Sequence, residues 1–352
     1  MTWRVLLTRG LSNVRDAVAL IHQAMTPGEF HLGVTYCTEH TPLRQVADSF
    51  HLELTVSEAD TYVEEVLELC RQQDFGWIWP QSRWSLWLQA QDRFTAAGIR
   101  SILPCPDIDT LEVLQDKARV NDRLVAAKVP LPHSIRVTTG DEFNAALAEL
   151  GGGARKVCIK PVQSIYGLGF RVIDDLKRPF DRLLSNDFFA IGSADFADLL
   201  DAAAGERPFL AMEYLTGDER SIDCLAWHGR LVRAVTRRKP SAAQGRWQII
   251  EEDPASWSIA ADVVREFQLH GLVNVQTRER LHADGHREPC FLEVNARMSG
   301  GIDMACQAGL NLPYWLLRLV TATTEEAHLP WPASGLRVAK IEQAVTLNGA
   351  SA

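Results

Sequence analysis

The stretch LVNVQTRERLHADGHREPCFLEVNARM, residues 272–298, decides the fold of this chain. Near its centre, Asp284-Gly285 is a dipeptide typical of a two-residue turn between antiparallel strands. Apolar and polar residues alternate on both sides of this dipeptide. The pattern therefore predicts a β-hairpin with one polar face and one apolar face.

Four polar side chains are predicted to share one face of this hairpin. A two-residue loop pairs Gln276 with Glu293 and Asn274 with Asn295. Because strand faces alternate, the intervening residues point toward a core; they are Val273, Val275, Leu292 and Val294. Mg²⁺ prefers carboxylate and amide oxygens and keeps positions for phosphate groups. The hairpin therefore predicts a magnesium site.

A solvated sheet face is the structural alternative for this hairpin. Such a face usually mixes Lys, Thr and Glu, and it seldom leads into a segment such as Arg297-Met298-Ser299-Gly300-Gly301. The residues after the hairpin therefore favour the metal site, although a β-bulge would shift the register. Ser299 to Gly301 and Asp303 could contact a substrate, or could simply begin a helix.

Length and composition narrow the class of protein. The chain has 352 residues, a length that suggests two or three packed units. Its net charge is -9. This charge argues against nucleic acid or an anionic membrane as the main partner, but it still allows local phosphate binding. The seven cysteines are scattered and form no CxxC pair. The first seven residues lack the longer apolar core and the small-residue cleavage site of a signal peptide, and no run approaches the ~18 uncharged apolar residues of a membrane span. We therefore expect a soluble, cytoplasmic protein.

The order of elements predicts two kinds of sheet. In the first hundred residues, short apolar runs alternate with helical patterns, which indicates a parallel sheet with crossovers. Residues 102–109 form a turn-rich connector, and one helix is expected from about Thr110 through Asp116-Lys117. After residue 151 the pattern changes to hairpins. The tryptophans at 77, 79, 84 and 87 fit core packing better than ligand stacking.

Lys160 ends an apolar strand and precedes a loop at residues 163–169. A lysine beside exposed backbone N–H groups is suited to holding phosphates, although Lys-Pro pairs are common. The chain lacks the Walker sequence and GxGxxG. A phosphate site at Lys160 would therefore differ from a P-loop or a dinucleotide fold.

Residues 209–238 predict a second strand pair. Glu219 and Asp223 would share one strand face, with a carboxylate available for ribose hydroxyls. A two-residue turn at His228-Gly229 would set Glu219 opposite Arg238. A surface ion pair explains this arrangement equally well.

Taken in chain order, five pieces resemble the ATP-grasp superfamily, and most of all a single carbamoyl-phosphate synthetase-like module of the carboxylate–amine/thiol ligase type. The resemblance covers roughly residues 5–320. The pieces are Asp116-Lys117, Ile159-Lys160-Pro161 with its Gly loop, Met212-Glu213-Tyr214-Leu215 with Gly217-Asp218-Glu219, Asn274-Val275-Gln276 and Glu293-Val294-Asn295-Ala296-Arg297.

The resemblance implies a mixed α/β and α+β fold. An N-terminal α/β pre-ATP-grasp domain would occupy residues 1–108. A two-lobed ATP-grasp fold with antiparallel sheets would follow, with its N-terminal lobe at 109–208 and its C-terminal lobe, carrying the metal site, at 209–352.

The resemblance also implies roles for individual residues. Arg297, near the acyl phosphate, and Lys160 would be catalytic. Gln276, Glu293 and Asn295 would bind the metal. The phosphates of ATP would contact Lys117 and Lys160, and Arg238 is a weaker match for a residue near the phosphates. Adenine would contact Glu213, Tyr214 and Leu215. The ribose would contact Glu219.

Three departures from the family pattern matter. Met212 stands where many members have a first hinge acid, the 163–169 loop has only two glycines, and Ala296 replaces a common proline. The chain corresponds to one module, so neither full carbamoyl-phosphate synthesis nor biotin carboxylation is expected.

The implied activity is an ADP-forming ligase that uses ATP and Mg²⁺, with Mn²⁺ as an alternative ion. It would activate a small carboxylate as an acyl phosphate and join it to an amine or similar nucleophile. A small-molecule kinase on the same fold and a non-catalytic nucleotide-binding regulator are the alternatives. Nucleic acid and membrane are not expected partners. Whether the chain forms a homodimer is left open by the sequence. Residues 240–248 are a candidate lid over the site.

Overall fold

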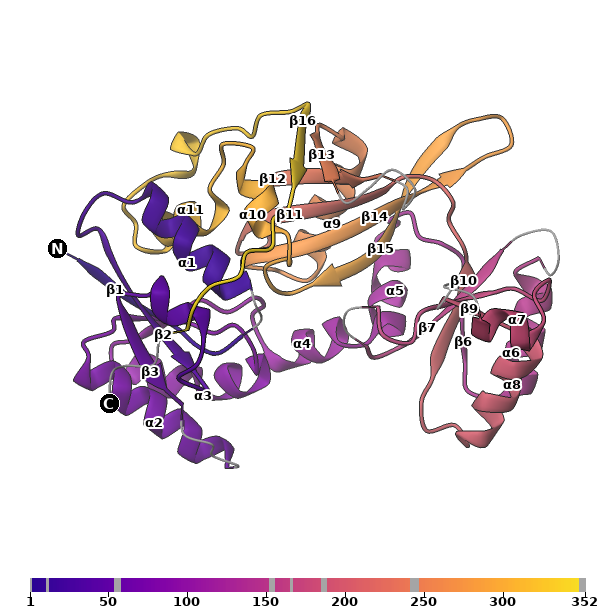
Figure 1. The fold of residues 1–352 in the computed structure, drawn as a ribbon, viewed down its shortest axis with the longest axis horizontal. Coiled ribbons are helices and arrows are strands. Elements are labelled where there is room, and N and C mark those ends of the chain that lie inside the picture. Colours follow the sequence, from indigo (N-terminus) through magenta and orange to yellow (C-terminus); the bar gives the residue numbers. More distant parts are fainter. Residues whose placement is uncertain are drawn as a thin grey trace. The chain divides into compact units, whose positions relative to one another are not determined.

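The computed structural model describes residues 2–10, 13–53, 58–151, 156–164, 167–184, 189–240 and 247–347. The chain divides into two compact units (Figure 1). Unit 1 consists of Met1–Leu111, Asp218–Gln276 and Val294–Ala352, and unit 2 consists of Glu112–Gly217 and Thr277–Glu293. The division at residues 108 and 208 expected from the sequence stays a prediction.

The first sheet of unit 1 is parallel, as the alternating pattern predicts. Its strand order is β3-β2-β1-β4-β5. The strands are β1 (Trp3–Leu7), β2 (Phe30–Tyr36), β3 (Ser49–Leu52), β4 (Trp77–Trp79) and β5 (Arg100–Ser101). The accompanying helices are α1 (Asn13–Ala24), η1 (Pro42–Gln45), α2 (Ala59–Gln72), α3 (Trp84–Ala96) and α4 (Ile108–Leu114).

Strand β1 is apolar because both of its faces are covered. Val5 and Leu7 pack in the cluster that includes α1, whereas Leu6 packs in the cluster that includes α2 and α3. All three side chains are fully buried. This arrangement is the reason that a parallel strand reads as a continuous apolar run.

Of the four tryptophans at positions 77, 79, 84 and 87, three are core residues. Trp77, Trp79 and Trp87 are buried in the two clusters that flank the parallel sheet. The indole N–H of Trp87 donates to the carbonyl oxygen of Ser82 at 3.0 Å, which satisfies its polar atom. Core packing is therefore confirmed for these three residues.

The second sheet of unit 1 is the long sheet that carries the predicted metal hairpin. Its order is β15-β14-β11-β12-β13-β16, and the division between the units passes through β14 and β15. The strands are β11 (Glu219–Trp227), β12 (Arg230–Lys239), β13 (Trp247–Glu251), β14 (Gly271–Leu281), β15 (Arg287–Asn295) and β16 (Leu336–Ala339). Its helices are α9 (Pro254–Glu266), α10 (Ile302–Cys306), α11 (Leu312–Val320) and η3 (Glu326–His328).

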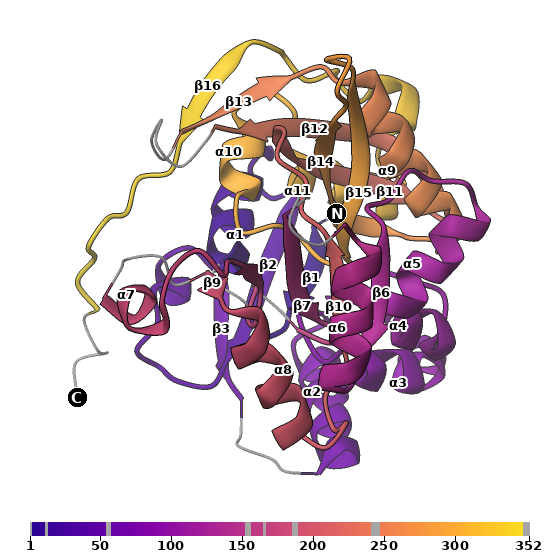
Figure 2. The ribbon, with the colours of Figure 1, turned by 90° about the vertical axis from the view of Figure 1, so that its right-hand side faces the viewer.

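Unit 2 is built on a smaller sheet of order β6-β10-β7-β8-β9, antiparallel except between β8 and β9. The strands are β6 (Ser134–Val137), β7 (Val157–Pro161), β8 (Arg171–Ile173), β9 (Ala190–Ile191) and β10 (Phe209–Glu213). The helices are α5 (Lys117–Ala126), α6 (Gly140–Glu149), α7 (Pro179–Leu184) and α8 (Ser193–Ala202). Figure 2 shows α6 and α8 side by side, and their Phe143 and Phe196 rings meet edge to face.

The single helix expected from Thr110 through Lys117 is wrong. Helix α4 ends at Leu114, and α5 begins at Lys117. Asp116 separates the two helices because its carboxylate caps the second one, accepting from the backbone N–H groups of Ala118 and Arg119. Lys117 therefore lies at the start of a helix, where its position is fixed.

Two further observations concern the chain as a whole. None of the helices in the described ranges has the length and apolar character needed to cross a membrane. All seven cysteines are free thiols, and only Cys37 is exposed.

Candidate functional site

Unit 2 brings together two lysines and one acid of the predicted site. The Lys160 Nζ donates to the carbonyl oxygen of Leu292 at 3.0 Å. Burial lowers the pKa of Lys160 to about 8, Lys117 acts in the same direction, and the charge of Glu293 opposes both. Burial likewise lowers the pKa of Lys117, again opposed by Glu293. Two ammonium groups therefore lie around one carboxylate.

Backbone contacts position these two lysines. The backbone N–H of Lys117 donates to the carbonyl oxygen of Val162 at 3.1 Å, which ties the start of α5 to the end of β7. The Lys117 Nζ donates to the backbone oxygen and the hydroxyl of Ser164, at 2.9 and 3.1 Å.

The loop at residues 163–169 needs a glycine at its end. Gly169 has a φ of +80, and a Cβ at this position would lie 2.5 Å from Pro161 Cγ. Of the loop at 163–169, residues 165–166 lie outside the described part of the chain.

The predicted adenine hinge also lies in unit 2. The Glu213 carboxylate pairs with the Arg280 guanidinium, at 3.0 Å between Oε2 and Nη2, and the Arg278 guanidinium lies 5.1 Å from the centre of the Tyr214 ring. Leu215 is buried. The backbone N–H groups of Glu213 and Tyr214 also donate within the protein, to the carbonyl oxygens of His133 and Lys156 at 2.9 and 3.0 Å. Met212 is buried in the core, so its side chain does not face a ligand at the hinge surface.

In unit 1, Glu219 pairs with Lys239, at 2.5 Å between Oε1 and Nζ. The predicted pairing of Glu219 with Arg238 is wrong. The Arg238 guanidinium instead pairs with Glu251 at 2.8 Å and Asp218 at 3.6 Å. Glu219 and Arg238 thus stay proposals as nucleotide contacts, and both already have ionic partners.

A β-bulge explains the changed pairing. The two-residue turn at His228-Gly229 is confirmed, since both residues have positive φ and Trp227 pairs with Arg230. Further along, Ala226 pairs with Leu231 but Leu225 pairs with Arg233. Val232 is the extra residue, and it moves every later pair by one position.

The metal hairpin also has a turn other than the one expected. The backbone N–H of His282 donates to the oxygen of His286, and that of Gly285 donates to the oxygen of His282. Gly285 has φ +85. These bonds define a three-residue loop with a left-handed glycine, so the two-residue loop is wrong. The pairings of Gln276 with Glu293 and of Asn274 with Asn295, which were counted from that loop, lose this support.

The predicted metal ligands fall in both units, Glu293 in unit 2 and the two amides in unit 1. The Gln276 Nε2 donates to Asn274 Oδ1 at 3.4 Å, which leaves its own Oε1 for another partner. The Asn295 Oδ1 accepts from Arg297 Nη2 at 3.1 Å and keeps a second lone pair. Carboxylate and amide oxygens each suit Mg²⁺, and the joint use of these three residues stays a prediction. Among the described residues, no group of three or more His, Cys, Asp and Glu side chains could hold a metal ion.

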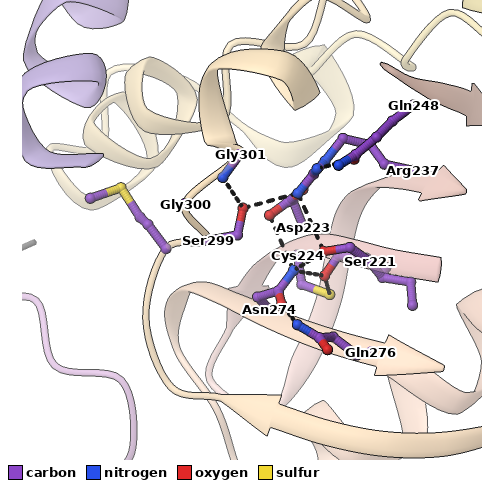
Figure 3. Close-up of polar contacts among 12 residues, drawn as sticks. Ser221, Asp223, Cys224, Arg237, Gln248, Asn274, Gln276, Ser299, Gly300 and Gly301 are labelled. Carbon is purple, nitrogen blue, oxygen red and sulfur yellow. Dashed lines mark hydrogen bonds and ion pairs between the residues drawn. The ribbon is translucent and has the colours of Figure 1, made fainter. Parts of the chain in front are cut away.

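A buried polar network in unit 1 was missed by the sequence reasoning (Figure 3). The Arg237 and Asp223 side chains are only 3% and 2% exposed, and the Arg237 Nε donates to Asp223 Oδ2 at 2.8 Å. Asp223 therefore has no exposed carboxylate for a ribose. The available signal was Ser221 and Asp223 at alternate positions in the apolar strand β11.

A small open pocket in unit 1 includes Arg297 in its lining, together with Trp84, Gln81 and His270. Burial lowers the pKa of His270 to about 4, so its ring is neutral at pH 7. The backbone N–H of His228 donates to His270 Nδ1 at 3.4 Å.

Most of the candidate lid at 240–248, namely residues 241–246, lies outside the described residues.

Comparisons with known proteins agree with this fold. A family model described as "ATP-grasp in the biosynthetic pathway with Ter operon" matches residues 205–344. No curated protein sequence matches the chain.

Solved structures are similar over nearly the whole chain. N5-carboxyaminoimidazole synthetase from Staphylococcus aureus has a TM-score of 0.65 at 12% identity, covering 94% of this chain and 79% of the other. The biotin carboxylase domain of Hydrogenobacter thermophilus 2-oxoglutarate carboxylase, solved with MgADP, ADP and bicarbonate, has a TM-score of 0.64 at 16% identity, covering 95% and 73%. L-amino acid ligase from Bacillus licheniformis has a TM-score of 0.61 at 14% identity, covering 94% and 77%.

At these identities the solved structures establish the fold, and the family model matches the C-terminal part of the chain by sequence. The parallel N-terminal sheet and the later antiparallel sheets agree with the fold class that the resemblance implies. The sequence of residues 205–344 thus matches an ATP-grasp family model, and the chain shares the fold of these solved structures over nearly its whole length.

Proposed function

We propose that the chain is an ADP-forming ligase that uses ATP and Mg²⁺ to join a small carboxylate to an amine or a similar nucleophile. The similar structures include an L-amino acid ligase and a biotin carboxylase domain solved with MgADP and bicarbonate, which supports this reaction class. The identity of the carboxylate and of the nucleophile is outside the proposal.

The cluster of Lys117, Lys160 and Glu293 is the observation that carries the proposal. Both lysines have a lowered pKa because they are buried, and both respond to the charge of Glu293. Holding two partly desolvated ammonium groups together is unfavourable unless anions join them. The phosphates of a nucleotide supply that charge, and Glu293 would supply one ligand of the Mg²⁺ that accompanies them.

The other residues would complete the site around the nucleotide. Gln276 and Asn295 would offer their amide oxygens to Mg²⁺, and the backbone at 213–215 would contact adenine. Arg297, which donates to Asn295 Oδ1, would stabilise charge on the reacting carboxyl group. When bound, Mg²⁺ would neutralise phosphate charge.

The chemistry needs positioning more than a protein nucleophile. A carboxylate oxygen would attack the γ-phosphorus of ATP, the bond from that phosphorus to the β–γ bridging oxygen would break, and ADP would leave. The amine nitrogen would then attack the acyl carbon. Inorganic phosphate would leave with the bonding electrons, and the nitrogen would lose a proton. Lys160 and Arg297 would hold the charged groups in line for these steps.

Hydroxylamine trapping tests the reaction class. With ATP, Mg²⁺ and a panel of small acids, a ligase should form a hydroxamate from the acyl phosphate as ADP appears. A kinase that phosphorylates a hydroxyl group would release ADP and form a stable phosphate ester without hydroxamate. A regulatory protein would bind ATP and release no ADP. Either of the last two results would overturn the proposal.

A further inference from the structure

Asn274 is the residue of β14 that links Gln276 to the buried network of unit 1. Its side chain is 1% exposed, so its hydrogen bonds must be made within the protein. The Asn274 Nδ2 lies within hydrogen-bonding distance of three acceptors: Ser221 Oγ at 2.9 Å, the Ile222 carbonyl oxygen at 3.1 Å and Asp223 Oδ1 at 3.2 Å.

These contacts allow only one orientation of the Asn274 amide. The carbonyl of Ile222 is an acceptor, and the Asp223 carboxylate paired with Arg237 is an acceptor as well. Turning the amide around would place Asn274 Oδ1 against both oxygens and would remove the donor that Asn274 supplies to these two buried acceptors. The Nδ2 therefore faces β11, and Oδ1 faces away from it.

The fixed orientation of Asn274 determines the orientation of Gln276. Asn274 Oδ1 can only accept, and the group that it meets is Gln276 Nε2 at 3.4 Å. If the Gln276 amide were turned, two carbonyl oxygens would face each other. Gln276 consequently presents its Oε1, the atom suited to a cation, on the side away from Asn274 (Figure 3).

Arg237 holds the other end of this network. Its guanidinium donates to Asp223 Oδ2 at 2.8 Å, to Ser299 Oγ at 3.1 Å and to Gln248 Oε1. Gly301 lies against it closely enough that a Cβ there would be 2.6 Å from Arg237 Nη1. Asp223 is thus held between Arg237 and Asn274 and cannot rotate toward another donor.

We propose that Asn274 is a positioning residue for the metal: by accepting from Gln276 Nε2, it holds Gln276 Oε1 toward Mg²⁺. This inference rests on the proposed function, because it takes Gln276 as a ligand of Mg²⁺. Partners that orient a metal ligand typically contribute about 10–100-fold to metal affinity. Asn274→Leu should therefore weaken Mn²⁺ binding at least about tenfold.

The experiment is a Mn²⁺ titration followed by EPR at saturating ADP, with a protein-free ADP blank, on wild type, Gln276→Ala, Asn274→Leu and the double variant. Because Asn274 acts through Gln276, the double variant should bind Mn²⁺ no more weakly than Gln276→Ala. Additive losses would overturn the inference. Affinity for ADP without metal should stay unchanged in all four proteins.

Two further variants separate positioning from a loss of stability. Asn274→Asp keeps the acceptor for Gln276 but places a second carboxylate beside Asp223, so it should keep Mn²⁺ affinity while lowering the urea midpoint at least as much as Asn274→Leu. Thr236→Val, at a buried position of β12, is the matched control and should keep Mn²⁺ affinity. If Mn²⁺ affinity follows the urea midpoint across these variants, Asn274 is only structural and the inference is wrong.

The outcomes also distinguish this inference from the proposed function. If wild type with ADP binds no Mn²⁺, or if Gln276→Ala binds it like wild type, the metal assignment fails and the role of Asn274 fails with it. If Gln276→Ala weakens binding and Asn274→Leu does not, only the role of Asn274 is overturned.

Discussion

The ammonium group of Lys160 donates to the carbonyl oxygen of Leu292, at 3.0 Å and 132 residues away in the sequence. This bond places the end of β7 beside the strand that carries Glu293. Burial of the ammonium group lowers the pKa of Lys160 to about 8. Lys160 therefore changes charge within an experimentally accessible pH range.

Nucleotide affinity should depend on this titration. Since the lowered pKa is about 8, Lys160 is mostly charged at pH 7 and mostly neutral at pH 9.5. The affinity for ADP, measured by isothermal titration calorimetry, should fall about tenfold over this interval. Lys160→Arg stays charged and should lose less affinity as the pH rises. If Lys160→Met shows the same fall as wild type, Lys160 is not the titrating group.

The buried pair of Arg237 and Asp223 should dominate the stability of unit 1. Arg237→Met leaves a carboxylate buried without its cation and should lower the free energy of unfolding by about 3–5 kcal/mol, measured in urea. Arg265→Met is the matched control, because the Arg265 pair with Asp262 is exposed, and it should cost less than about 1 kcal/mol. Similar losses in both variants would show that the Arg237 pair is not special.

His270 should make the protein less stable in mild acid. Burial lowers its pKa from the ordinary value of 6.5 to about 4 in the folded chain, so the unfolded chain binds the proton more readily between these values. The stability from the neutral ring is present above pH 6.5 and is lost as the pH falls toward 4. Between pH 7 and pH 5, wild type should lose about 2 kcal/mol more than His270→Phe in urea unfolding. Equal losses in the two proteins would contradict this assignment.

Much of the fold could be predicted from local patterns. The period-two alternation and the Asp284-Gly285 and His228-Gly229 signals locate both hairpins of the long sheet. The alternation of strands and helices also predicts the parallel N-terminal sheet. These signals are local, because each depends on a few neighbouring residues.

Register could not be predicted in the same way, because a single residue changes it. Val232 forms a bulge that replaces Arg238 by Lys239 as the partner of Glu219, and the left-handed Gly285 lengthens the loop between β14 and β15. Neither residue differs from an ordinary strand or turn residue in the sequence. Both depend on the packing of the sheet.

The buried network could not be predicted for a related reason. Asn274 has the same spacing as Gln276 on β14, and the two residues read as one polar face. Only the three acceptors around Asn274 Nδ2 show that it faces β11. Tertiary contacts therefore distinguish Asn274 from the proposed metal ligand Gln276, although both side chains end in an amide.

The most direct test of the central claim is ADP release by wild type and by Glu293→Gln, measured with ATP, Mg²⁺ and a panel of small carboxylates and amines. Wild type should release ADP only when a carboxylate substrate is present. Glu293→Gln should fall below about one-hundredth of that rate, since it loses the one carboxylate of the proposed metal site. Its urea midpoint should match that of the exposed control, Glu252→Gln. Near-normal ADP release by Glu293→Gln, or no release by wild type across the panel, would contradict the account.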